Sequence, residues 1–345
     1  MSSHIHRNAP FRAEHLGSLK RPQLLLDKRF AVDKNEAISK DLTPLEDQAI
    51  KEIVQTQVQL GLRAVSDGEY RRHMFWRTFI PGLDGFGKIQ NPDIELFRLY
   101  VPDIAAFTES GHEPGETVIC TGKIKHTGQS AYVGQVEYLK TLLPKERWGE
   151  MKLTLAAPIY GSFPTSFDDF CSEKMIEGWK SDKDNSTTIK ELFHAYINFY
   201  NERISKAPAY MHIGIHLCRG NFVNSRHFSD GGYDRIATKL FRDFNVSTFY
   251  LEYDTPRAGR FDPLQSLPKN ENVILGVITK RIYLAAEMIA KGSGQTKEDA
   301  LKRLGVSPQC GFASHAEGNL IDTEVMKKKL ALVRHIAEEI WPGEL

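Results

Sequence analysis

Features that mark several classes of protein are missing or scarce in this chain. Only four of its 345 residues are cysteine, too few for a disulfide-built scaffold. No apolar run reaches the roughly 18 residues of a membrane-spanning helix, and the N-terminal stretch lacks the apolar segment of a secretory signal. We therefore expect a cytoplasmic protein whose cysteines are free thiols, with no membrane partner.

A strong net charge is also missing. Lys plus Arg number 45 and Asp plus Glu number 44, which leaves a net charge of +1 at pH 7. This balance argues against a nucleic-acid or membrane-surface role based on bulk charge. The chain is 41% hydrophobic and 26% charged, as in ordinary globular proteins, and its length suits one large α/β domain with insertions or two to three small domains.

Helical and strand-like segments alternate along most of the chain. Apolar residues at helical spacing predict a helix from Thr43 to Gly61, and a short strand at 62–66 follows it directly. Further strands are expected at 151–156, 211–218, 247–252 and 272–279, and further helices at 189–204, 233–244, 282–289 and 326–341. This alternation predicts a parallel sheet covered by helices, and the length favours a closed (β/α)8 TIM barrel.

Residues 80–150 interrupt this rhythm. They are rich in Gly, Pro, Thr and Lys, and they contain strand-like pieces at 116–119 and 131–133. We interpret them as a hairpin-like subdomain inserted into a single domain that spans residues 1–345.

Four side chains that can bind a metal follow separate strands. His216 and Cys218 are two residues apart on one face of a strand, so an imidazole nitrogen and a thiolate can reach one ion. Glu252 ends the next strand, and Cys310 lies in a Pro/Gly-flanked loop after a later strand. In a barrel these positions share the rim that carries active sites. Two thiolates, an imidazole and a carboxylate suit Zn²⁺ better than Mg²⁺ or Ca²⁺.

Spacing alone does not establish a metal site at these residues. A single cysteine on an apolar strand is usually a small buried hydrophobic residue, and a single strand histidine is often satisfied within the core. A disulfide between Cys218 and Cys310 is a further alternative, although the expected compartment disfavours it.

Five ordered motifs resemble the cobalamin-independent methionine synthase family. They are RAEHLGSL at 12–19, VSDGE at 65–69, GIHLCRGN at 214–221, LEYD at 251–254 with RAG at 257–259, and SPQCGFAS at 307–314. The chain resembles most the short, single-barrel members, which match the catalytic C-terminal half of the long enzymes. The resemblance covers residues 10 to 341 and implies Zn²⁺ bound by His216, Cys218, Glu252 and Cys310, the set that spacing had suggested.

The resemblance also implies an activity and a substrate. It implies a methyltransferase that moves a methyl group, from 5-methyltetrahydrofolate or a similar donor, to the thiol of homocysteine. Glu69 would pair with the substrate ammonium and Ser18 with its carboxylate, while Asp67 is either a further substrate contact or a helix cap. The zinc-bound thiol would lose its proton and attack the methyl group. A related transferase that alkylates coenzyme M with an epoxide, and a barrel that has lost catalysis, are the alternatives.

The sequence departs from the family pattern at two joins. A strand ending in an acid should precede the strand of His216, but about one βα unit is absent between residues 165 and 168. The loop after the strand at 272–279 is short, and Thr279-Lys280 stands where the long enzymes have a histidine proposed to donate a proton. Either the chain is shortened or residues of the natural protein are missing from this sequence. We favour the second, because a barrel without an internal strand should not close.

Overall fold

The computed structural model describes residues 9–73, 78, 80–109, 111, 117–128, 130–156, 167–220, 227–276, 279–314 and 318–345. Its helices are α1 (Gln23–Asp33), α2 (Leu42–Gln59), α3 (Pro102–Glu109), α4 (Ala131–Leu142), α5 (Glu173–Ser181), α6 (Ile189–Ile204), α7 (Ala237–Asp243), α8 (Thr279–Ser293), α9 (Lys297–Leu301) and α10 (Thr323–Ile340). Its strands are β1 (Leu83–Ile89), β2 (Thr117–His126), β3 (Gly214–Leu217), β4 (Thr248–Glu252), β5 (Asn272–Gly276) and β6 (Leu304–Val306). The fold is therefore mixed α/β, as the alternating pattern predicted.

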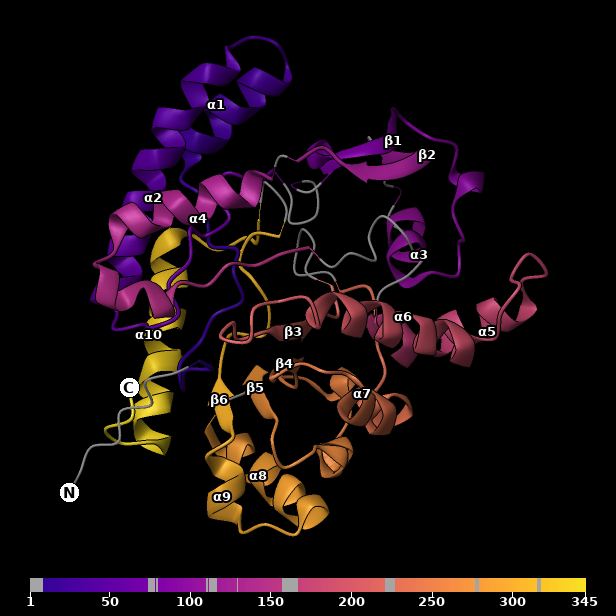
Figure 1. Ribbon diagram of the computed structural model, residues 1–345, viewed down its shortest axis with the longest axis vertical. Coiled ribbons are helices and arrows are strands. Elements are labelled where there is room, and N and C mark those ends of the chain that lie inside the picture. Colours follow the sequence, from indigo (N-terminus) through magenta and orange to yellow (C-terminus); the bar gives the residue numbers. More distant parts are fainter. Residues whose placement is uncertain are drawn as a thin grey trace.

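A four-stranded parallel sheet forms the centre of the described fold. Its strand order is β3-β4-β5-β6, and all three pairs are parallel. The strands β4 and β6 are buried along their whole length, which explains their continuous apolar sequences. Helix α7 connects β3 to β4 and lies beside the strands in Figure 1, whereas α8 and α9 connect β5 to β6 and lie below them.

Two isolated parallel bridges extend the same arrangement beyond β6. Ala13 pairs with Val306, and Val65 pairs with Met151. The side chain of His15 connects these two pairs, because its Nε2 lies 2.9 Å from the carbonyl oxygen of Ala64. The strands expected at 62–66 and 151–156 are therefore represented only by a single bridge between them, and the segment around Ala13, where no strand was expected, forms a similar bridge to β6.

The described residues do not form a closed barrel. Strand β3 is an edge of its sheet. The absent βα unit would place its strand between residues 151–156 and β3, where consecutive strands of a barrel are neighbours. Leu155 and Met211, which lie in the segments on either side of this position, are 61% and 52% exposed. The expected closure is thus not found, and the residues at the joins, 157–166 and 277–278, lie outside the described part of the chain.

The segment 80–150 contains one antiparallel pair, β1 with β2, and two helices. The strand expected at 116–119 is the start of β2, but the strand expected at 131–133 is wrong, since these residues begin helix α4. The β-prone pair Tyr132-Val133 is overridden because α4 buries Gln135 and Leu139, four residues apart, on one helical face. In Figure 1 the β1–β2 pair and α3 lie on the opposite side of the molecule from α8 and α9.

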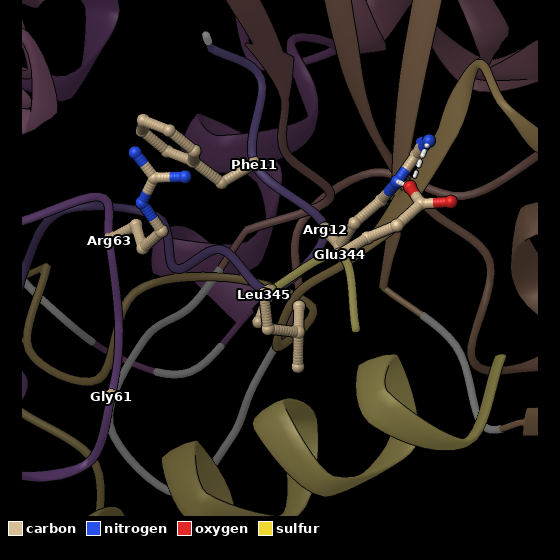
Figure 2. Close-up of a pocket in the computed structure, with 7 residues that line it drawn as sticks. Phe11, Arg12, Gly61, Arg63, Glu344 and Leu345 are labelled. Atoms are coloured by element: carbon tan, nitrogen blue, oxygen red, sulfur yellow. Dashed lines mark hydrogen bonds and ion pairs between the residues drawn. The ribbon is translucent and has the colours of Figure 1, made fainter. Parts of the chain in front are cut away.

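The two ends of the described chain meet near the sheet. The guanidinium of Arg12 pairs with the carboxylate of Glu344 at 2.7 Å, and Arg63 lies over the ring of Phe11 (Figure 2). The cavity that these residues line has a volume of only about 10 Å³, enough for about one water molecule. These contacts join the N-terminal segment to the C-terminal residues. No described helix is both long and apolar enough to cross a lipid bilayer.

Candidate metal centre

Backbone pairing places the first two candidate ligands on neighbouring strands. His216 lies in β3, opposite Tyr250 of β4, and Glu252 is the last residue of β4. The imidazole Nε2 of His216 lies 3.9 Å from Oε1 of Glu252. Register thus brings two residues that are 36 positions apart in the sequence to the same end of the sheet.

The two cysteines meet at the same end. Cys218 follows β3 directly, and Cys310 lies in the loop after β6. Their sulfur atoms are 3.4 Å apart, and both residues are free thiols, so the disulfide alternative is not formed. The Cys310 loop can approach because Gly276 has no side chain: a Cβ there would lie 2.7 Å from Cα of Gln309.

His216, Cys218, Glu252 and Cys310 together offer four ligand atoms, all within 4.8 Å of one another. Nε2 of His216 and Oε1 of Glu252 are buried and have no hydrogen-bond partner. Buried polar atoms are normally satisfied, so two unsatisfied atoms facing two sulfurs are unusual. A cation at their centre would satisfy both, and this donor set suits Zn²⁺.

Neighbouring groups orient these ligands. Nδ1 of His216 lies 3.2 Å from the carbonyl oxygen of Tyr250, which leaves Nε2 free to face the other ligands. The side-chain amide of Gln309 donates a hydrogen bond of 2.8 Å to Oε2 of Glu252, and Oε1 remains free. Supporting bonds of this kind are a regular feature of metal sites in proteins, because they fix the direction of each ligand.

The ionisable groups of the cluster shift one another's pKa values. Burial, together with the charge of Cys310, raises the pKa of Glu252 to about 7. Burial alone would lower the pKa of His216, but the neighbouring Cys310 sulfur and the other negative charges around it outweigh burial and raise that pKa to about 9. The cluster therefore favours bound positive charge, which a divalent cation supplies more strongly than protons do.

Ser18 contacts the loop that carries Cys310. Its carbonyl oxygen accepts a hydrogen bond of 2.7 Å from the backbone N–H of Phe312, and its Oγ accepts one of 3.3 Å from Ala313. Arg21, which no sequence pattern had singled out, donates to the carbonyl oxygens of Ala313 and Glu69. The Ser18 loop and the Glu69 loop therefore both adjoin the Cys310 loop.

Glu69 is buried in a strained turn. Its φ is +61°, and its backbone N–H donates to Oδ1 of Asp67 at 2.9 Å. Asp67 thus stabilises the turn, in the manner of an Asx turn and not of a helix cap. Burial raises the pKa of Glu69, while Arg72 and a hydrogen bond from Thr154 oppose that rise. Non-glycine residues seldom adopt this conformation, so the turn is typical of a functional position.

Asp168 is a further buried acid beside the candidate metal ligands, and no sequence pattern had identified it as a candidate. Its Oδ2 accepts a hydrogen bond of 2.9 Å from the backbone N–H of Cys218, and burial raises its pKa to about 8. In the sequence, Asp168 comes directly after the point where a βα unit is expected to be missing. An acid at that point was the signal that could have identified it. The side chains of Thr279 and Lys280, which the resemblance set against a histidine of the long enzymes, lie outside the described part of the structure.

Comparisons with known proteins agree with this arrangement. No family model matches the chain. Two uncharacterized Bacillus subtilis proteins, YxjH and YxjG, are 29% and 28% identical to it, and each alignment covers 97% of this chain and 96% of the relative. The YxjH alignment spans 381 positions, so at least 36 of them are gaps in this 345-residue chain.

Solved structures extend the comparison to the fold. A provisionally named vitamin-B12-independent methionine synthase from Listeria monocytogenes is 23% identical, with a TM-score of 0.61 and coverage of 97% of this chain and 99% of that one. A B12-independent methionine synthase from Shewanella sp. W3-18-1, in complex with selenomethionine, is 15% identical, with a TM-score of 0.61 and coverage of 96% and 97%. The resemblance expected from the sequence is thus confirmed at the level of the fold, which this chain shares with B12-independent methionine synthases over nearly its whole length.

Proposed function

We propose that this protein is a zinc-dependent methyltransferase that converts homocysteine to methionine, with 5-methyltetrahydrofolate or a similar compound as the methyl donor. The observation that carries the proposal is the convergence of four ligand atoms within 4.8 Å, two of them buried without any other partner. The shared fold of B12-independent methionine synthases supports it. We assign the activity to the cytoplasm, where thiols remain reduced.

The ligand atoms would be Nε2 of His216, Sγ of Cys218, Oε1 of Glu252 and Sγ of Cys310. Zn²⁺ held by these residues would lower the pKa of a coordinating thiol, and so would supply the substrate sulfur as a nucleophilic thiolate at neutral pH. The chain's own residues keep the ligands aimed at one point. The Tyr250 carbonyl orients His216, and the Gln309 amide orients Glu252.

Glu69 and Ser18 would hold the amino-acid end of homocysteine. Oε2 of Glu69 is buried without a partner, and a substrate ammonium would satisfy it. The Ser18 hydroxyl accepts its bond from Ala313 and keeps its own proton to donate to the substrate carboxylate. In the reaction the sulfur forms a bond to the methyl carbon, the methyl–donor bond breaks, and the departing donor takes up a proton.

The fold that carries this site is proposed to be one domain of residues 1–345, a (β/α)8 barrel with an insertion at 80–150. Seven of its eight strand positions correspond to described segments, and the fourth is the position of the missing unit. Restoring that unit would supply β3 with a neighbour on its open edge.

Metal analysis and X-ray absorption of the purified protein test this proposal. We expect one zinc per chain with a mixed S/N/O shell, and one more sulfur in that shell when homocysteine is added. Methyl transfer to homocysteine should then be assayed with a panel of methyl donors. A four-ligand shell that never accepts the substrate sulfur would indicate a structural metal. Alkylation of another thiol by an epoxide would favour the alternative transferase.

A further inference from the structure

The carboxylate of Glu69 has one oxygen fixed and one free. Oε1 accepts a hydrogen bond of 2.5 Å from the hydroxyl of Thr154 and lies 3.5 Å from a guanidinium nitrogen of Arg72. Oε2 is buried and has no partner. A side chain held by one oxygen presents the other in a constant direction, which a group that recognises an ammonium requires.

Arg72 is the centre of this arrangement. One of its terminal nitrogens donates to Oγ1 of Thr154 at 3.2 Å, and the other donates to the carbonyl oxygen of Thr154 at 2.7 Å. The Thr154 hydroxyl therefore accepts a hydrogen bond from Arg72 and donates one to Glu69. Because the Arg72 side chain is only 1% exposed, it faces the protein and is not available to solvent.

Helix α4 of the 80–150 segment holds Arg72 from the other side. Oε1 of Gln135, itself buried, accepts a hydrogen bond of 3.1 Å from Arg72, and the guanidinium lies over the ring of Tyr132 at 5.2 Å. Two residues on one face of α4 thus contact the cation that contacts Glu69. The preceding residue, Arg71, pairs instead with Glu46 and Asp47 of α2, and its guanidinium lies over the ring of Tyr138 in α4.

We propose that Arg72 is a positioning residue for Glu69, and that helix α4, through Gln135 and Tyr132, makes recognition of the substrate's amino group depend on the 80–150 segment. The chain from α4 to the acid runs Gln135–Arg72–Thr154–Glu69, and every link in it is a contact of 3.5 Å or less. The inference rests on the proposed function, in which Glu69 receives the ammonium of homocysteine.

Two thiols that differ only in the amino group test it. Homocysteine carries the ammonium, and 4-mercaptobutanoate has hydrogen in its place. Their affinities for the zinc-loaded protein are measured by calorimetry in the wild type, Arg72→Met, Arg72→Lys and Gln135→Leu. Arg71→Met is the matched control, because it removes a neighbouring arginine whose polar and ring contacts among the described residues are with α2 and with Tyr138 of α4, and not with Gln135, Thr154 or Glu69. Zinc content and thermal unfolding of every variant establish that it is folded and loaded.

We expect the wild type to prefer homocysteine by roughly 10- to 100-fold, the range for a charge-assisted contact. Arg72→Met should lose most of this preference while its affinity for 4-mercaptobutanoate and its zinc content stay unchanged. Arg72→Lys should restore part of it, Gln135→Leu should lose part of it, and Arg71→Met should keep all of it.

Three results would overturn the inference in distinguishable ways. An Arg72→Met protein that still prefers homocysteine as strongly as the wild type shows that Glu69 needs no such support. Equal loss of affinity for both thiols shows that Arg72 acts on the fold or on the carboxylate. A zinc-loaded wild type that binds neither thiol overturns the proposed function itself, and the inference with it.

Discussion

On the metal side of the candidate site, His216 and Glu252 stand on β3 and β4, and continuous backbone pairing sets their positions. On the acid side, Glu69 stands in a strained turn, and the side chains of Thr154 and Arg72, the latter held by Gln135, set its position. Backbone register aligns residues over a whole strand, whereas a side-chain network depends on each member. The metal side should therefore tolerate changes in its surroundings better than the acid side does.

Removal of a metal ligand is expected to have the largest effect. If four ligands share a zinc-binding free energy of about 10–16 kcal/mol, each contributes about 3 kcal/mol. Cys310→Ser should therefore weaken zinc binding by about 100- to 1,000-fold, abolish methyl transfer and leave the circular dichroism spectrum unchanged. Cys120→Ser, at an exposed cysteine of β2, should match the wild type. Full zinc content and turnover in Cys310→Ser would contradict the proposed site.

Low pH should destabilise the folded protein through His15. Burial, with help from the charge of Lys152, lowers the pKa of His15 in the folded protein to about 4, whereas an unfolded histidine has a pKa of about 6.5. The folded state therefore binds this proton less readily. The stability linked to His15 is complete above about pH 6.5 and is lost as the pH falls toward 4, by up to about 3 kcal/mol.

Urea unfolding across that pH range measures the effect. His15→Gln should be less stable than the wild type at neutral pH, because the imidazole bridges Gln57 and the Ala64 carbonyl, each at 2.9 Å. Its stability should also change less between pH 6.5 and 4 than that of the wild type. A wild type that loses no more stability than this variant would show that His15 is not held neutral.

A supporting residue on the metal side should matter less than a ligand. Gln309→Leu removes the amide that orients Glu252, and losses of this kind typically weaken metal binding by about 10- to 100-fold. Competition with a chelator measures this loss. Gln55→Leu, at an exposed position of α2, is the control and should bind zinc normally. Equal zinc affinity in the two variants would mean that β4 alone orients Glu252.

The smallest effect on stability is expected at Leu155, beside the open edge where the neighbouring strand of β3 is absent. Leu155→Lys should change the free energy of unfolding by no more than about 0.5 kcal/mol, because Leu155 is already largely exposed. The matched change Leu251→Lys, in buried β4, should cost several kcal/mol or prevent folding, as expected for an unpaired buried charge. Strong destabilisation by Leu155→Lys would indicate that something covers this edge in solution.

Much of the metal side could be predicted from the sequence. Alternation along the strand of His216 and Cys218, and the position of Glu252 at the end of the next strand, follow from the geometry of parallel strands. The resemblance named Cys310 for the same site. The acid side was harder to predict. Thr154 donates a hydrogen bond to Glu69, but the two residues are 85 positions apart and no sequence motif contains both.

The sequence by itself predicted strands β3, β4 and β5 and helices α2, α6, α7, α8 and α10, because apolar periodicity reflects burial over short distances. It also indicated that a strand was missing, and the sheet is open where that strand would lie. It failed at 131–133, where β-prone residues belong to helix α4. Tertiary structure alone decided that α4 lies against Arg72, and that Arg72 lies against the acid. Such contacts depend on how distant elements pack, and no local pattern of residues records that packing.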